Sequence, residues 1–318
     1  MTLENSSILE RPGKMRSLLY AVLSMLFWGL SFVWFKQVFV VYRPITIIFL
    51  RLVISGSLLL IFIKLSQKSF RVEKADLKWF FLLAFTQPFC YFMGESFGLT
   101  KVSSTISSVI IATIPLFSPI AAYFVFRERV SQSTLSGIVI SLAGIVIMLL
   151  KPDLSFNASP DGIGLLFFAV FSAIAYSLVI RRLAGNYPVI TIIALQNIIG
   201  AIYFLPFFLI FDLNHFLAAK PSAGAIVALI ELAFFASTLA YIFYIISIRD
   251  IGVIRANVFS NLIPVFTGIA SYFLLSEEFS IAKIAGMALV LAGVVVSQLP
   301  HFRGRAKRRE TLHKKLKL

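Results

Sequence analysis

Charged residues are scarce in this chain: Asp, Glu, Lys and Arg together make up 14% of its 318 residues. A soluble domain usually has about 25% charged residues, so this chain has too few to cover a surface that faces water. Apolar residues make up 59% of the sequence, and the mean hydropathy is +0.93. This balance indicates a protein that is surrounded by lipid rather than by water.

Cysteine and histidine are also rare, which excludes several kinds of chemistry. The single cysteine, Cys90, cannot form an intramolecular disulfide, and the three histidines are scattered. We therefore expect no metal site and no cofactor. The sequence has no GxxxxGK[ST] loop, which excludes a nucleotide-driven pump. It also shows no nucleophile–base pair or metal constellation, so we do not expect an enzyme.

Ten apolar segments match the requirement of about 20 residues for a helix that crosses the hydrocarbon core. The first five are Leu18–Phe39, Ile45–Ile63, Leu77–Leu99, Ile106–Phe126 and Leu135–Leu150. The second five are Gly162–Ile180, Val189–Phe211, Ala223–Ile248, Val253–Leu275 and Ile281–Leu299. No A-x-A-like cleavage site follows the first segment, so we expect it to be retained. The sequence predicts an all-α integral membrane protein with ten transmembrane helices.

The basic residues predict the orientation of the chain. If the N-terminus is cytoplasmic, 22 of the 29 lysines and arginines fall in cytoplasmic segments and 6 fall outside. By the positive-inside rule, both termini are then cytoplasmic, and we expect a multi-pass protein of a bacterial plasma or inner membrane. The basic tail lacks groove-reading residues, so we expect it to attract anionic lipid and not nucleic acid.

The two halves of the chain resemble each other at a nearly fixed offset. Residues 149 positions apart match at Pro115 and Pro264, Glu128 and Glu277, Gly137 and Gly286, and Gly144 and Gly293. We expect a cytoplasmic segment 1–17, five-helix repeats over 18–150 and 161–299, and a basic cytoplasmic tail 300–318. An odd number of spans inverts the second repeat. Inverted repeats are typical of secondary transporters.

Several short motifs carry a family resemblance. They are Trp28-Gly29-Leu30-Ser31-Phe32, Arg51, and, in each half, a proline followed by a glutamate and a glycine-bearing span. In this order the chain resembles the EamA-type members of the drug/metabolite transporter superfamily, over about Leu18–Leu299. The resemblance implies ten helices, alternating access, and transport of amino acids, metabolites or drugs. It also implies a cavity lined mainly by spans one, three, four, six, eight and nine.

Three ionisable residues lie well inside apolar spans: Arg51, Glu95 and Glu231. Charges at this depth cost about 2.5–3.5 kcal/mol on insertion scales, and they usually face the protein interior or a wet cavity. Glu95, with Gln87 two turns earlier on nearly the same helical face, is the leading candidate for proton coupling. For Glu231, function and a structural hydrogen bond are evenly balanced. Arg51 suits a substrate carboxylate, but neutralising Glu95 and snorkelling to the interface are equal alternatives, and a structural role is favoured.

Four further residues are candidates for the substrate site: Trp28, Tyr176, Tyr241 and Asn257. Aromatic residues in membrane helices more often face lipid or pack in the core. Trp28 and Tyr176 occupy matching places in the two halves and are therefore the better pair.

Pro115 and Pro264 are hinge candidates, because proline removes a helical hydrogen bond and kinks the helix. A fixed packing kink is the alternative. The small-residue faces of Gly137/Gly144 and Gly286/Gly293 predict close helix packing or a homodimer. Gly94 and Gly98 form a GxxxG that seats span three closely enough to turn Glu95 inward.

The leading hypothesis is a secondary transporter that moves a small-molecule substrate, with possible proton coupling, in contact with membrane lipid. An intramembrane enzyme is an alternative, but it needs a catalytic constellation. A channel is another, and it needs a pore-lining ring or a filter motif.

Overall fold

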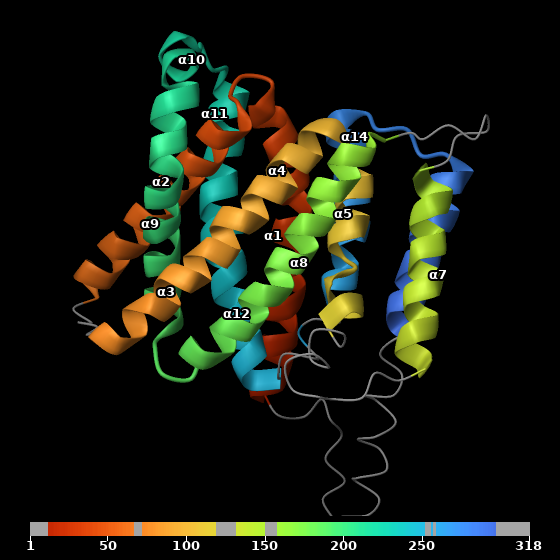
Figure 1. Cartoon of the computed structure of the whole chain (residues 1–318), viewed down its shortest axis with the longest axis horizontal. Coiled ribbons are helices and arrows are strands. Elements are labelled where there is room, and N and C mark those ends of the chain that lie inside the picture. Colours follow the sequence, from red (N-terminus) through yellow and green to blue (C-terminus); the bar gives the residue numbers. More distant parts are fainter. Residues whose placement is uncertain are drawn as a thin grey trace, which may run out of the picture. The chain divides into compact units, whose positions relative to one another are not determined.

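The computed structural model describes residues 12–66, 72–118, 132–149, 158–251, 256 and 259–296. Three sequence-based candidates, Glu128, Asn257 and the basic tail, lie outside these residues. Within the described residues every regular element is a helix (Figure 1). The chain divides into two compact units, one of Met1–Ile111 with Ala158–Glu277 and the other of Ala112–Asn157 with Glu278–Leu318.

The first unit contains most of the helices. In its first sequence half these are α1 (Pro12–Phe39), α2 (Pro44–Leu65), the 3-10 turn η1 (Lys74–Asp76), α3 (Leu77–Ala84), the π-helical η2 (Phe85–Cys90), α4 (Tyr91–Lys101) and α5 (Ser104–Ile111). In its second half they are α8 (Pro160–Leu183), α9 (Val189–Phe207), π-helical η3 (Phe208–Asp212), α10 (Leu213–Ala218), α11 (Ala223–Glu231), π-helical η4 (Leu232–Leu239), α12 (Ala240–Ile251), 3-10 η5 (Phe259–Leu262) and α14 (Ile263–Leu275). The second unit contains α7 (Gln132–Leu149) and the helix Ile281–Val296.

The membrane-spanning prediction is confirmed. Five helical stretches are long and apolar enough to cross a bilayer, namely Met15–Phe39, Pro44–Leu65, Pro160–Ile180, Val189–Ala218 and Ala223–Ile251. Four shorter apolar stretches are Ser104–Ser118, Leu135–Leu149, Phe259–Leu275 and Ile281–Val296. The path from α3 through η2 to α4 supplies the remaining span. The fold is all-α, with ten spans.

The third span is not the continuous helix that its hydropathy predicts. Gln87 has φ −153° and ψ 120°, an extended conformation inside the π-helical turn between α3 and α4. Pro88 follows it, and proline disfavours the helical conformation in the residue before it. The prediction that Gln87 and Glu95 share one face of a continuous helix is therefore wrong, because the backbone between them is interrupted.

The GxxxG prediction for α4 is confirmed. A Cβ atom on Gly94 would lie 2.5 Å from the carbonyl oxygen of Leu165 and 2.9 Å from the amide nitrogen of Ala169, both in α8. A Cβ on Gly98 would lie 3.1 Å from the carbonyl oxygen of Gly162. Only glycine permits this approach of two backbones. The two contacts therefore fix the position of α4 against α8.

In the second unit, α7 and the helix Ile281–Val296 lie side by side (Figure 1), and their glycine faces pack on each other. A Cβ on Gly144 would lie 2.7 Å from the carbonyl oxygen of Gly286, and a Cβ on Gly293 would lie 2.7 Å from that of Gly137. Between these contacts the Ser141 hydroxyl donates a hydrogen bond of 3.1 Å to the carbonyl oxygen of Val290. The packing interpretation of these faces is confirmed within one chain, and a dimer through them stays a prediction.

The two hinge candidates occupy equivalent places. After α5 ends at Ile111, residues 112–113 form a turn and the helix resumes at residue 114, so that Pro115 is its second residue. Pro264 is likewise the second residue of α14, directly after the 3-10 turn η5. Proline is well tolerated in the first turn of a helix, where its missing N–H has no intrahelical partner. Each proline therefore begins a helical segment after a break, and the hinge role stays a prediction.

Candidate functional site

A set of buried polar side chains lies inside the first unit, where helices from both sequence halves meet. We call it the polar cluster. Its members are Arg51 and Ser55 of α2, Gln87 of η2, Tyr91 and Glu95 of α4, Gln196 and Asn197 of α9, Ser237 and Thr238 of η4, and Tyr241 of α12. Trp28 of α1 and Tyr176 of α8 pack beside them.

The π-helical segment η4 organises this cluster. A π-helical turn does not form the regular hydrogen bonds of an α-helix, and side chains of other helices bind two of its carbonyl groups here. The carbonyl of Ala236 accepts from Trp28 Nε1 at 3.2 Å. The carbonyl of Ser237 accepts from Ser55 Oγ at 3.1 Å and from Asn197 Nδ2 at 3.2 Å. The irregular backbone is therefore satisfied by polar partners inside the protein, as a membrane interior requires.

Thr238 extends the same network. Its hydroxyl donates to the carbonyl of Ala233 at 2.9 Å, and it lies 2.6 Å from the hydroxyl of Ser55. Ser55 in turn accepts a hydrogen bond of 2.7 Å from Asn197 Nδ2. Helices α2, α9 and η4 are thus joined near the middle of their spans by side-chain hydrogen bonds.

Arg51 is held by one edge of its guanidinium group and is 3% exposed. Its Nε donates a hydrogen bond of 2.8 Å to Ser237 Oγ. Its guanidinium carbon lies 4.3 Å from the ring centroid of Phe92, a cation–π contact. Among the described residues, no hydrogen bond uses its two terminal nitrogens. These two nitrogens form the planar fork that binds carboxylates.

Glu95 is 9% exposed and has one hydrogen-bonded oxygen. Its Oε1 accepts from the Tyr91 hydroxyl at 2.8 Å. In the described part of the chain, ion pairs within 4.0 Å join Arg43 to Asp212 and Lys101 to Asp161, and none joins Glu95 to Arg51. The two charges are nevertheless close enough to attract each other electrostatically. They do not form a direct ion pair, and the structural role of Arg51 favoured from the sequence stays a prediction.

Three of the residues predicted from the sequence as site candidates lie next to one another: Gln87, Tyr241 and Trp28. Gln87 Nε2 donates a hydrogen bond to the Tyr241 hydroxyl. The ring of Trp28 meets those of Tyr241 and Tyr244 edge-on, at centroid distances of 5.2 and 5.0 Å. The extended conformation of Gln87 is what lets its side chain reach α12. These residues form an aromatic wall with an amide group beside it.

Tyr176 belongs to the same buried core as Tyr241, and its hydroxyl donates to Gln196 Oε1 at 3.1 Å. Glu231, in contrast, is not brought into the cluster. It is half-buried at the end of α11, and no hydrogen bond or ion pair joins it to another described residue. Asn257 lies outside the described residues, and Pro115 and Pro264 are near breaks in their own spans.

Sequence reasoning misses Ser55 and Ser237, which tie Arg51 and Asn197 to the backbone of η4. Serine is common in membrane helices, where it usually binds its own backbone. The one available signal is indirect, because an arginine and an asparagine buried in lipid-spanning helices must find partners.

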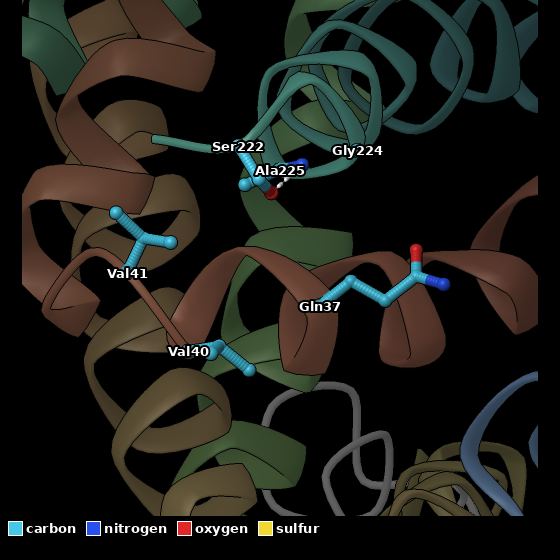
Figure 2. A pocket seen from close by; sticks show the side chains of 6 residues that line it. All are labelled: Gln37, Val40, Val41, Ser222, Gly224 and Ala225. Atoms are coloured by element: carbon cyan, nitrogen blue, oxygen red, sulfur yellow. Dashed lines mark hydrogen bonds between the residues drawn. The ribbon is translucent and has the colours of Figure 1, made fainter. Parts of the chain in front are cut away.

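A surface pocket of about 320 Å³ lies elsewhere in the first unit, beyond the end of α1. Its lining residues are Gln37, Val40, Val41, Ser222, Gly224 and Ala225 (Figure 2). Ser222 is occupied as the N-cap of α11, because its hydroxyl accepts from the amide of Ala225 at 3.2 Å. The pocket has no charged lining residue, whereas the polar cluster has two, Arg51 and Glu95. The described residues also contain no group of three His, Cys, Asp or Glu that could hold a metal. The polar cluster is therefore the candidate site.

Comparison with solved structures supports the fold. One crystal structure superposes with a TM-score of 0.66, over 89% of this chain and 98% of the other, at 17% sequence identity. At this identity the likeness concerns the fold alone.

Sequence relatives come from all three domains of life. The chain is 28% identical to an uncharacterized transporter of Archaeoglobus fulgidus, over 89% of this chain and 98% of that protein. It is 25% identical to the uncharacterized transporter YetK of Bacillus subtilis, over 78% and 76% of the two chains. It is also 25% identical to a chloroplastic WAT1-related protein of Arabidopsis thaliana, over 86% and 67%. Two of these three names indicate transport rather than catalysis.

The family comparison covers most of the sequence. Residues 15–150 and residues 161–298 each match the EamA-like transporter family. Together with the ten apolar spans and the buried polar cluster, this makes the protein a multi-pass membrane transporter of the drug/metabolite transporter superfamily. The chain belongs to the EamA-like transporter family.

Proposed function

We propose that the protein carries small zwitterionic solutes, amino acids or closely related compounds, across a bacterial plasma membrane by alternating access, with Glu95 coupling transport to protons. The observation that supports this most directly is the polar cluster itself. It contains a buried arginine and a buried glutamate that are not paired with each other. Buried charges are costly unless they have a partner or a function.

The bonding of the two charges indicates which solute groups they bind. Arg51 has its terminal nitrogens unoccupied by described residues, and a carboxylate is their natural bidentate partner. Glu95 has one oxygen bound to Tyr91 and a second oxygen without a hydrogen bond among the described residues. That oxygen accepts either an ammonium group or a proton. A solute with a carboxylate and an ammonium group satisfies both side chains.

The aromatic residues around the cluster favour solutes with an apolar part. Phe92 covers one face of the Arg51 guanidinium, while Trp28 and Tyr241 form the aromatic wall. Ligand sites commonly combine such apolar walls with a few placed polar groups. The charged groups select the backbone of an amino acid, and the wall accommodates its side chain.

Alternating access is supported by the position of the cluster between the repeats. Its charged residues belong to the first sequence half, while Ser237, Thr238 and Tyr241 belong to the second. A site at the interface of inverted repeats is exposed to one side of the membrane at a time when the repeats exchange conformations. With both termini in the cytoplasm, as the basic residues favour, α1 crosses from the cytoplasmic face to the outer face.

Uptake into proteoliposomes tests the proposal. We expect the wild-type protein to accumulate a subset of amino acids when a pH gradient is imposed, and to exchange them without one. E95Q keeps the size of the side chain and removes its titration. This variant should fold and exchange solute, but lose accumulation driven by the gradient.

Two further variants complete the experiment. R51Q removes the carboxylate-binding group, so it should raise the KM for amino acids by roughly tenfold or more, as loss of a charge-assisted hydrogen bond predicts. E231Q is the matched control, because Glu231 is also a carboxylate in a membrane helix but lies outside the cluster. Full gradient-driven accumulation by a stable E95Q protein would eliminate Glu95 as the coupling residue.

A further inference from the structure

One carboxylate outside the polar cluster, that of Glu277, joins the two sequence halves. It lies near the C-terminal end of α1. Glu277, just beyond the end of α14, binds the first turn of α5. Its Oε1 accepts from the amide of Ser104 at 2.8 Å, and its Oε2 accepts from the hydroxyl of Thr105 at 2.7 Å and the amide of Thr105 at 3.4 Å. We call Glu277 and these three donors the Glu277 latch.

Such a contact is well suited to hold two helices together. The first amides of a helix have no intrahelical partner, and the helix dipole adds partial positive charge there. A carboxylate on another element satisfies both requirements. Lys36 of α1 is close enough to attract Glu277 electrostatically, and Ser104 Oγ donates to the carbonyl of Phe32 in α1 at 3.3 Å. The latch therefore closes the space between α1, α5 and α14 at this end of the unit.

Two serine hydroxyls near the latch are fully buried and unpartnered. Ser107 of α5 lies three residues beyond Ser104, and Ser271 of α14 lies six residues before Glu277. Each is 0% exposed, and neither hydroxyl has a hydrogen-bond partner in the part of the chain that the structure describes. Ser107 is about one helical turn from Ser104, and the carbonyl of Ser271 accepts from the amide of Glu277 at 3.1 Å, so both are near the latch. Buried hydroxyls without partners are rare and unfavourable, and water or a polar solute would satisfy them if the helices separated.

The turn that carries Glu277 is strained in the closed arrangement. Ser276 has φ 55° and ψ 34°, the left-handed conformation that glycine adopts easily and other residues rarely do. It ends α14, so that the amide of Glu277 donates to the carbonyl of Ser271 at 3.1 Å. Strained residues are common in segments that switch between two conformations, because the strain favours breaking the contact.

A second carboxylate that binds the start of a helix, Asp212, offers a comparison. It accepts from the amide and the hydroxyl of Thr46 at 3.0 and 2.9 Å, at the start of α2. Helices α2 and α9 are also bound to each other at mid-length, where Asn197 donates to Ser55. No strained residue and no unpartnered hydroxyl accompanies Asp212 among the described residues nearby in sequence. The Glu277 latch has both.

From these three observations, we propose that the Glu277 latch is the gate on the outer face of the transporter, and that its release opens a hydroxyl-lined path past Ser107 and Ser271. The identity of the face rests on the orientation given in the proposed function. When Glu277 leaves α5, the space between α5 and α14 opens and the two serines become solvated. When Glu277 binds α5, the path is closed, and the polar cluster is then accessible only from the cytoplasm.

Thiol labelling tests the gate without any substrate. S107C is introduced in a C90S background, and a membrane-impermeant maleimide is added from outside to intact cells or oriented proteoliposomes. E277Q should label roughly tenfold faster than the parent, because it loses charge-assisted hydrogen bonds. E278Q is the matched control, because it makes the same change at the next residue and leaves the hydrogen bonds of Glu277 in place, and its rate should equal that of the parent.

A second variant works in the opposite direction. S276G relieves the left-handed strain without touching the carboxylate, so it should favour the closed gate and label roughly threefold more slowly. Ser276 is exposed, so this variant should fold even if E277Q does not. Labelling of S107C that neither E277Q accelerates nor S276G slows would overturn the gate. Absence of uptake by the wild-type protein in proteoliposomes would contradict the proposed function alone, because labelling requires no transport.

Discussion

At the scale of single residues, the polar cluster is determined by partners that lie far apart in the sequence. Asn197 is an example: its amide nitrogen binds both Ser55 Oγ and the carbonyl of Ser237. Each of these bonds joins α9 to another helix. In a membrane the alternative to such a bond is an unsatisfied polar group, although measured side-chain bonds between membrane helices average only about 0.6 kcal/mol.

We expect N197L to lower the free energy of unfolding by about 1–2 kcal/mol, because it keeps the volume but removes two donors. Thermal unfolding in detergent measures this change. N186A is the control, since Asn186 is exposed and makes a single bond of 3.5 Å to the carbonyl of Arg182. Equal stability of N197L and N186A would contradict a structural role for the Asn197 bonds.

At the scale of helices, α4 is positioned by how closely it packs on α8. Gly94 comes directly before Glu95, so the contact that seats the helix also sets the position of the carboxylate. The obstacle to a side chain at Gly94 is backbone, which cannot move aside as a flexible side chain can. Packing and function are therefore linked at adjacent positions.

We expect G94A to destabilise the protein by about 1–3 kcal/mol, the usual cost of overpacking, and to reduce gradient-driven transport because Glu95 shifts with α4. Unfolding and uptake measure the two effects. G164A is the matched control on α8, where a Cβ atom would meet nothing within 4 Å. It should leave both properties unchanged, and a G94A protein that behaves like G164A would contradict the close contact.

The breaks before Pro115 and Pro264 lead to a separate expectation. P115A and P264A should express normally but transport roughly tenfold more slowly, because alanine lets the helix continue through the break and stiffens it. Initial uptake rates measure this. P206A serves as the control, since Pro206 is an exposed proline inside α9. Unchanged rates in both hinge variants would make these prolines packing features.

The sequence predicts some of these elements well and others poorly. The close packing at Gly94 and Gly98 could be predicted directly, since small residues four apart are enriched where membrane helices pack closely. The interruption at Gln87 could not, because an extended residue leaves hydropathy unchanged, and Pro88 was its only local signal. The π-helical η4 has no such signal at all. Its carbonyls are bound by Trp28, Ser55 and Asn197, and those contacts depend on tertiary packing.

At the scale of the whole molecule, the order and number of spans follow from hydropathy and from the repeat. Membrane helices satisfy their own backbones, so their composition is visible in the sequence. The site was predicted in part. Burial of Arg51 and Glu95 follows from their depth in apolar spans, but whether they pair depends on distances that only the structure provides.

Orientation leads to a further prediction. Reporter fusions at the C-terminus and in the segment between Lys64 and Lys78 should both report a cytoplasmic location, because basic residues are retained on that side. A phosphatase that is active only in the periplasm, paired with a fluorescent protein that is active only in the cytoplasm, measures this. A periplasmic C-terminus would contradict the inverted arrangement of the repeats and the assignment of the Glu277 latch to the outer face.

The contact between α7 and Ile281–Val296 carries information about ancestry. Gly137 and Gly286 are equivalent in the two repeats, as are Gly144 and Gly293. Gly144 contacts Gly286, and Gly137 contacts Gly293. Ser141 meets Val290, its own equivalent 149 positions away. Both helices thus use the same surface in this contact. Such an interface is called isologous, and it is the kind that joins identical subunits around a two-fold axis. A five-helix chain bearing this surface would recognise its own inverted copy, so gene fusion needed only to connect two subunits that already fitted.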